Sequence, residues 1–208
     1  SRAGVRERQP PVSCWVTVAF IDLVGFTGYV RSRDPAEIVE VVDGYQAGID
    51  ALAERHGAVL GKLLGDGALV YYPDDGDRGL NAVRCLRMLN ELPALLGELN
   101  GNWRQRGHLV DLKVRSGVAS GFCALGDWGS DERLEHTVIG DCVNLASRLQ
   151  QAAEPNSGLV CEVTAALVSG RTTRSTGCQP LGAGRSVPLR GVGDVLAYPL
   201  VDVAGRRL

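Results

Sequence analysis

Two short apolar runs of this chain each contain a single aspartate. Asp22 lies in the run 16–27, and Asp66 lies in the run 59–70. Both runs have the length and the β-branched or aliphatic composition of buried strands. A carboxylate in such a strand is costly unless a cation compensates its charge. Because glycines lie close to both aspartates and leave room for a ligand, the pair predicts a site for two divalent cations.

Length and composition indicate one ordinary globular domain. The 208 residues suffice for one well-buried core, and 45% hydrophobic with 22% charged residues is typical of such domains. The net charge of -2 gives no reason to expect a nucleic acid partner. No stretch reaches the roughly 20 apolar residues of a membrane span. We therefore expect a cytoplasmic protein, or the cytosolic part of a larger, membrane-attached protein whose sensory domain lies outside this sequence.

The cysteines and histidines do not form a metal motif. The six cysteines have no C-x-x-C spacing, and most lie in apolar strand or helix patterns. The three histidines are dispersed along the chain. We expect reduced thiols that fill the core, with neither a disulfide framework nor a zinc site. The cysteines are Cys14, Cys85, Cys123, Cys142, Cys161 and Cys178.

Lysine is rare in this chain, and its placement is informative. Of 22 basic residues only Lys62 and Lys113 are lysines. Lys62 lies inside an apolar strand pattern, four residues before Asp66. A lysine at a strand end can simply extend its ammonium group to solvent. The contrast with the many surface arginines favours a second interpretation, a compact donor directed into a site.

The order of predicted elements indicates a single α/β (α+β) domain over residues 14–208, preceded by a polar linker or tail at 1–13. Asp34-Pro35 predicts a helix start, and the apolar runs on either side of Asp66 predict a hairpin with Asp66 at its tip. We expect a mixed, mostly antiparallel sheet with helices packed on one face, which brings Asp22 and Asp66 to the same end. The predicted strands are 14–23, 58–64, 68–73, 109–119, 121–126, 136–139, 157–161, 187–190 and 194–202, and the predicted helices are 35–56, 78–100, 141–152 and 162–169.

Two further groups of residues are candidates for substrate contacts. Asn144 and Arg148 lie four apart on one face of the helix 141–152, where an amide and a guanidinium could orient a sugar and neutralise a phosphoryl group. Taken alone, this stripe is better explained as a solvated helix face. Arg115 and Arg190 lie in or beside apolar strands. They are either strand-edge arginines or bidentate grips for a polyphosphate.

The turn that follows Asp22 is a third candidate. Its backbone N–H groups around Gly25, Phe26 and Thr27 could cradle phosphates, although an ordinary loop would have the same sequence.

Three segments together resemble the motifs of the class III nucleotidyl cyclase catalytic domain. They are 20–27, 64–67 and 137–149, and the resemblance extends over about residues 14–202. It implies a ferredoxin-like palm, which is the nucleotide cyclase fold. It also implies that Asp22 and Asp66 bind two Mg²⁺ or Mn²⁺ ions per active site, with the carbonyl of Leu23 as a further ligand.

The resemblance also assigns the substrate contacts. Lys62 falls on the position that recognises the base and Thr137 on its partner position. Asn144 and Arg148 would orient the ribose and stabilise the transition state. Arg115 and Arg190 match positions that hold the terminal phosphates, the latter being lysine in many relatives, and Phe26 and Thr27 belong to the phosphate-binding turn. Family members work as head-to-tail dimers, so the resemblance implies a homodimer with two shared sites.

The Lys62 and Thr137 pair resembles that of a bacterial subgroup that makes cyclic AMP, several members of which respond to bicarbonate. Lys62 can donate to adenine N1 and the Thr137 hydroxyl can accept from the N6 amino group, whereas guanine has the opposite pattern. The expected function is an adenylyl cyclase that converts ATP to 3′,5′-cyclic AMP and pyrophosphate. A guanylyl or dual-specificity cyclase and a catalytically silent nucleotide-binding or dimerisation module are the alternatives. His136 stands where relatives often have tyrosine and receives no functional interpretation.

Overall fold

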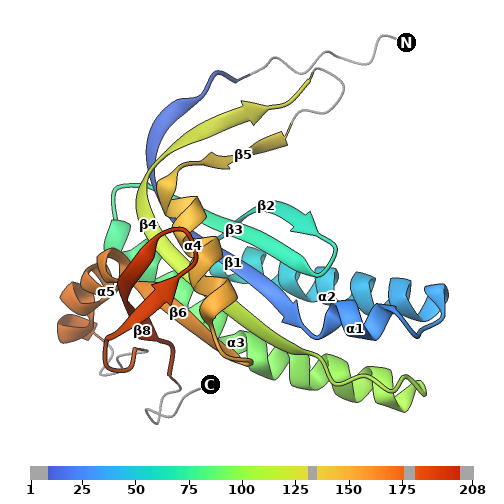
Figure 1. Ribbon diagram of the computed structural model, residues 1–208. Coiled ribbons are helices and arrows are strands. Elements are labelled where there is room, and N and C mark those ends of the chain that lie inside the picture. Colours follow the sequence, from blue (N-terminus) through green and yellow to red (C-terminus); the bar gives the residue numbers. More distant parts are fainter. Residues whose placement is uncertain (1–8, 131–134, 176–180, 202–208) are drawn as a thin grey trace.

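The computed structural model describes residues 9–130, 135–175 and 181–201. Within these ranges a single sheet has helices on both faces (Figure 1). Its strands are β1 (Val12–Val24), β2 (Val59–Leu64), β3 (Gly67–Pro73), β4 (Lys113–Trp128), β5 (Glu135–Ile139), β6 (Ser157–Cys161), β7 (Arg185–Leu189) and β8 (Gly193–Pro199). The helices are α1 (Phe26–Val30), α2 (Pro35–His56), α3 (Arg78–Gln105), α4 (Asp141–Ala152) and α5 (Glu162–Ser175).

Strand β1 lies between β3 and β4 in the sheet. The strand order is β2-β3-β1-β4-β6-β8-β7, with β5 paired to β4. β1 is antiparallel to both β3 and β4, whereas β4 and β6 are parallel. Asp22 is opposite Gly67 on one side and Arg115 on the other. The predicted mixed, mostly antiparallel sheet is therefore confirmed, as is the predicted proximity of the first strand to the hairpin.

Helices cover both faces of the sheet, so the expectation of helices on one face was wrong. Ala19, Ile21 and Leu23 of β1 belong to a core shared with α2 and α3. Val16 and Val18, which point the other way, belong to a second core with α4. Alternate residues of a strand face opposite sides, so the nearly continuous apolar run of β1 is the sequence signature of a strand covered on both sides.

Several boundaries differ from the prediction. The two strands expected at 109–119 and 121–126 form one strand, β4, which passes through Gly121 without a break because Val16 of β1 pairs with it. Residues 109–112 are not in a strand. The main chain of Leu112 instead exchanges two hydrogen bonds with the Asn100 side chain. Helix α3 continues through Pro93 to Gln105.

The amino end of β1, the carboxyl end of β4 and β5 extend together beyond the body of the domain (Figure 1). Gln9 and Asp127 form two hydrogen bonds there, one between their main chains and one from Gln9 N to the Asp127 carboxylate. Residues 1–8 of the predicted 1–13 tail lie outside the described residues, as do 202–208, whereas β1 already begins at Val12, two residues before the predicted strand. None of the described helices has the length and apolar character needed to cross a membrane.

Candidate active site

Asp22 and Asp66 lie at the same end of the sheet. Asp22 is near the carboxyl end of β1, and Asp66 is in the two-residue turn between β2 and β3. The N–H of Leu23 donates to the Asp66 carbonyl at 3.0 Å, which fixes the turn against β1. Gly65 has φ 61°, a left-handed conformation that glycine adopts without strain. Local turn chemistry and strand pairing thus bring the two carboxylates together, as the sequence predicted.

One oxygen of Asp22 accepts three hydrogen bonds. Arg115 donates to Oδ2 from Nε at 3.3 Å and from Nη2 at 3.0 Å, and Gln150 of α4 donates from Nε2 at 3.1 Å. The Asp22 side chain is 24% exposed. It is therefore not the fully buried acid that the apolar run predicted, because it lies where β1 reaches the edge of the core. Among the described residues, these three hydrogen bonds all go to Oδ2.

Asp66 is the less stabilised of the two acids. Loss of hydration raises the pKa of its carboxyl group, and the neighbouring negative charge of Asp22 raises it further. A backbone hydrogen bond and the positive charge of Arg115 partly oppose this rise. Two carboxylates that repel each other at a partly desolvated end of a sheet are the arrangement that a divalent cation stabilises.

The available donors fit hard cations. No cluster of three or more histidine, cysteine or acidic side chains that could hold a metal occurs among the described residues. A metal here would be bound by the carboxylates of Asp22 and Asp66 and by main-chain oxygen. Oxygen ligands of this kind suit Mg²⁺ and Mn²⁺ and do not suit a zinc site.

The turn after Asp22 has the open geometry that phosphate contact requires. Gly25 has φ 83°, and a Cβ placed on it would meet no atom within 4 Å. Glycine is therefore needed for the backbone conformation, and the space beside it is free. Phe26 packs against the core, and its ring centroid lies 6.2 Å from that of Tyr29. Thr27 is exposed.

Asn144 and Arg148 line a hollow of about 920 Å³ on the face of the sheet that α4 covers. Arg190, in the turn between β7 and β8, lines the same hollow. The other lining residues are Ser120, Gly121, Phe122, Asp141, Cys142, Leu145, Gly191, Val192 and Val195. Phe122 and Val192 are both more than half exposed, so the hollow has an apolar rim beside its two arginines and amide.

Helix α4 points its polar side chains in two directions. Gln150 is buried against Asp22, while Arg148 lines the hollow. Two residues along an α-helix correspond to a rotation of about 200°. Arg148, and Asn144 one turn before it, are consequently directed away from the acids of their own chain.

Two cysteine side chains contact each other where the start of α4 packs on the sheet. The Sγ atoms of Cys123 in β4 and Cys142 in α4 are 2.7 Å apart. This hydrogen bond, and then burial, raise the pKa of the Cys142 thiol. The five described cysteines are free, as predicted, and Cys178 lies outside the described residues.

Lys62 and Thr137 form a third group, on β2 and β5. Thr137 Oγ1 is buried and has no hydrogen-bond partner in the described structure. The Lys62 ammonium is bound by both carboxylate oxygens of Glu135, at 2.9 and 3.2 Å. His136, on the opposite side of β5, bonds to Asp127 at 2.8 Å.

The predicted site residues thus occur in three groups within one chain. Arg115 is with Asp22 and Asp66, and Arg190 is with Asn144 and Arg148, so the structure does not bring the two arginines together. Sequence reasoning missed Gln150 and Glu135. Gln150 follows the apolar stripe of its helix and had no signal of its own, whereas Glu135 is two residues before Thr137 on the same side of a short strand.

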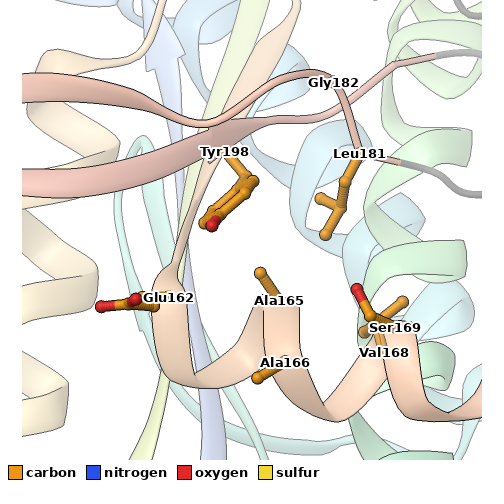
Figure 2. A pocket seen from close by; sticks show the side chains of 8 residues that line it. All are labelled: Glu162, Ala165, Ala166, Val168, Ser169, Leu181, Gly182 and Tyr198. Carbon is orange, nitrogen blue, oxygen red and sulfur yellow. The ribbon is translucent and has the colours of Figure 1, made fainter.

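A second hollow, of about 230 Å³, lies between α5 and β8. Figure 2 shows Tyr198 and Leu181 facing Ala165 and Val168 of α5 across it. The eight described residues that line it include no predicted site residue. It is therefore separate from the three groups above.

Comparison with known proteins places these features in a family. The chain matches the adenylate and guanylate cyclase catalytic domain over residues 9–201, and it belongs to that family. It is 32% identical to an uncharacterized protein of Mycobacterium tuberculosis over 200 residues, which cover 92% of this chain and 32% of that protein. The chain therefore spans about a third of the length of the curated relatives it matches.

Solved structures agree with the family assignment. The adenylyl cyclase CyaB from P. aeruginosa is 26% identical, with a TM-score of 0.82 and coverage of 92% of this chain and 96% of that one. The guanylyl cyclase Cya2 is 24% identical and has the same fold, with a TM-score of 0.83 and coverage of 93% and 95%. The predicted nucleotide cyclase fold is confirmed.

Proposed function

We propose that this domain is an adenylyl cyclase that converts ATP to 3′,5′-cyclic AMP and pyrophosphate at the interface of a head-to-tail homodimer. The observation that carries the proposal is the division of the site residues. Asp22 and Asp66 lie at one end of the sheet, while α4 directs Asn144 and Arg148 away from them into an open hollow. A second copy that supplies its own acids to this hollow completes two equivalent sites.

The acids and arginines would bind the triphosphate. Asp22, Asp66 and the carbonyl of Leu23 would hold two Mg²⁺ or Mn²⁺ ions, on which catalytic domains of this family generally depend. Such ions, when bound, activate the attacking ribose 3′-oxygen and stabilise the pyrophosphate that leaves. When substrate binds, Arg115 would give up its hydrogen bonds to Asp22 and bind the terminal phosphates. Arg190 of the other subunit would bind the same phosphates.

Two polar groups and a turn complete the arrangement around the reacting phosphate. Asn144 orients the ribose, so that its 3′-oxygen attacks the α-phosphate in line. The hydroxyl proton passes to solvent or to a substrate phosphate, and the bond between the α-phosphorus and the pyrophosphate oxygen breaks. Arg148 neutralises the charge that develops on this phosphate in the transition state. The N–H groups of Phe26 and Thr27, at the open turn after Gly25, contact the phosphates.

The base contacts favour ATP over GTP. Thr137 Oγ1 is a buried hydroxyl without a hydrogen-bond partner among the described residues, and the adenine N6 amino group can supply one. Lys62 donates to adenine N1 but would meet an N–H on guanine. A guanylyl or dual-specificity cyclase is the second candidate, because the similar structures include both an adenylyl and a guanylyl cyclase. A silent nucleotide-binding module is the third, although such a module has no need of both Asp22 and Arg148.

The regulation is part of the proposal. The catalytic domain includes residues 9–201, over which the family match extends, and the residues before Gln9 would connect it to a sensory domain. Because the chain spans about a third of its relatives, those proteins have room for such a domain. A bicarbonate response would follow from the Thr137 subgroup, and adding bicarbonate to the purified domain tests it.

Product analysis tests the proposed reaction. The wild-type domain is incubated with equal ATP and GTP plus Mn²⁺, and we expect cyclic AMP to exceed cyclic GMP. Asp22→Ala and Asp66→Ala should each lose turnover by at least about 100-fold while remaining folded, because each removes a ligand of the ions that position the phosphate. Full activity in either variant refutes the metal assignment, and nucleotide binding without pyrophosphate release from the wild type favours the silent module.

A further inference from the structure

The lysine that would contact the base is not free in this structure. Both oxygens of Glu135 bind the Lys62 ammonium, so that a strand at one edge of the sheet is linked to the extension formed by β4 and β5 (Figure 1). Lys62 is at an irregularity of β2, since the pairing of β2 with β3 shifts register between Leu60 and Lys62. The lysine side chain therefore has a defined partner on a different element.

Glu135 belongs to the same surface as Thr137. The two residues are two apart in β5, so their side chains point to the same side of the strand. Their cross-strand neighbours on β4 are Trp128 and Gly126, and the Trp128 indole donates to the Thr137 carbonyl at 3.3 Å. Glu135 thus pairs with Lys62 from the side of β5 on which Thr137 lies, and the Thr137 hydroxyl has no hydrogen-bond partner among the described residues.

We propose that Glu135 determines the nucleobase specificity of this domain by holding Lys62 in position and by keeping its own carboxylate occupied. This inference rests on the proposed function, because it concerns the same base site. Neither Lys62 nor Thr137 alone would fix where the ammonium points, since a lysine side chain has four rotatable bonds. Glu135 supplies that constraint.

The chemistry of the two bases explains why the pairing matters. A free carboxylate near the base accepts hydrogen bonds from the N1–H and the 2-amino group of guanine, whereas adenine has an acceptor at N1. When both oxygens of Glu135 are bound to Lys62, guanine meets an ammonium group in place of an acceptor. Breaking the pair should therefore weaken the contact to ATP and improve the contact to GTP.

The ion pair contributes little to folding. The Lys62 and Glu135 side chains are 39% and 52% exposed, and pairs in such positions are only weakly stabilising. Variants at Glu135 should fold normally. A functional test is consequently free of a stability artefact, and thermal unfolding of each variant verifies this.

The first experiment compares Glu135→Gln with wild type, using kcat and KM for ATP and for GTP. We expect the KM for ATP to rise about two- to fivefold, the range in which a partly exposed ion pair contributes, with kcat nearly unchanged. The ratio of kcat/KM for ATP to that for GTP should fall by at least the same factor. Glu135→Asp, which keeps the charge, should recover part of the loss.

A charge exchange gives the sharpest test. The double variant Lys62→Glu with Glu135→Lys keeps the ion pair but reverses it, placing the carboxylate on β2. We expect its ATP preference to fall by about tenfold or more, because a polar group of the wrong type then faces adenine. Glu91→Gln is the matched control, since Glu91 is a 46% exposed carboxylate that pairs with Arg55 and His56.

Binding measurements separate failure of this inference from failure of the proposed function. Calorimetry with 3′-deoxy-ATP and Mn²⁺ reports base recognition without turnover, because this nucleotide lacks the attacking hydroxyl. If the wild type binds 3′-deoxy-ATP but forms no cyclic nucleotide from ATP or GTP, the proposed cyclase activity is refuted. The effect of Glu135 on base specificity can still be measured by binding. If Glu135→Gln and the charge exchange bind ATP and GTP analogues as wild type does, the role of Glu135 is refuted.

Discussion

Two neighbouring aspartates of the candidate site differ in how the protein compensates their charge. Asp22 accepts three N–H hydrogen bonds on one oxygen, from Arg115 and Gln150. Asp66 is partly desolvated, and its pKa is raised by that loss of water and by Asp22. The protein's own groups thus stabilise the charge of Asp22 well and that of Asp66 less well. A bound divalent cation would therefore stabilise the charge of Asp66 more than that of Asp22.

The raised pKa of Asp66 makes a prediction about stability. A group whose pKa is higher in the folded state stabilises the fold at pH below its usual value, and this stability is lost as the pH rises through the raised value. Ionised Asp66 therefore weakens the metal-free fold at neutral pH. We expect Asp66→Asn to raise the Tm at pH 7.5 by roughly 1 to 3 °C without metal, with the gain disappearing near pH 3. Thermal unfolding at several pH values measures it.

Asp74 provides the control of opposite sign. A hydrogen bond from Arg78 is the largest cause that lowers the pKa of Asp74, and the N–H of Gly76 adds to it. Asp74→Asn should therefore lower the Tm at neutral pH and have less effect in acid. If Asp66→Asn also lowers the Tm at pH 7.5, the electrostatic account of Asp66 is wrong. Added Mn²⁺ should stabilise wild type more than Asp66→Asn.

At the scale of elements, the contact of β4 with α4 is the closest packing near the site. A Cβ placed on Gly117 would lie 2.1 Å from the Gln150 nitrogen and 2.2 Å from the Ala146 carbonyl oxygen. Both are main-chain atoms of α4, so no side-chain rotation can relieve the clash. Glycine at this position determines how deeply the helix that carries Arg148 sits on the sheet.

This packing predicts the effect of one added methyl group. Gly117→Ala must move α4 outward, so we expect a loss of about 1 to 3 kcal/mol in unfolding free energy. Turnover should fall by about 100-fold in the fraction that remains folded, since Arg148 and Asn144 move with the helix. Urea unfolding and initial rates measure the two effects.

Gly97 is a matched control in a different helix. It is an exposed residue of α3, and a Cβ there would meet no atom within 4 Å. Gly97→Ala should therefore raise the free energy of unfolding by up to about 1 kcal/mol, through helix propensity, and leave turnover unchanged. Wild-type activity in Gly117→Ala would show that the position of α4 does not control the reaction.

The sequence predicted the helices and strands near the site, but it did not predict how they pack against one another. The hairpin around Asp66 and the helix of Asn144 and Arg148 follow from local turn and helix patterns, and both were predicted. The burial of Gln150 could not be predicted, because it depends on a glycine 33 positions away that admits α4 to the sheet. The pairing of Glu135 with Lys62 likewise joins strands that are distant in the chain.

At the scale of the whole molecule, the three groups of site residues predict that two inactive subunits can complement each other. In the proposed site, Asp22→Ala removes a metal ligand and Arg148→Ala removes the residue that would neutralise the transition state. In a head-to-tail dimer, a mixed pair has one site free of both substitutions. Equal mixing should restore about a quarter of the wild-type rate, because half of the dimers are mixed and each has one intact site.

Cyclic AMP formation by the single variants and by their mixture checks this prediction. The double variant in one chain, mixed with either single variant, is the control and should stay inactive. A mixture no more active than its components means that each site is formed within one chain. The family resemblance implied that the metal residues of one subunit face Asn144 and Arg148 of the other. The residue patterns alone did not, since this division depends on the direction in which α4 presents each residue.

The hydrogen bonds between Gln9 and Asp127 have a mechanical consequence. They tie the chain ahead of β1 to the residue of β4 adjacent to Gly126, and Gly126 pairs directly with Thr137. Pro11 packs closely against Gly126, since a Cβ placed on Gly126 would lie 2.7 Å from the Cα of Pro11. A displacement of Gln9 is thereby transmitted to the strand that carries Thr137, the proposed contact of the base, through a few atoms. It does not have to pass through the helices or through the end of the sheet that carries Asp22 and Asp66.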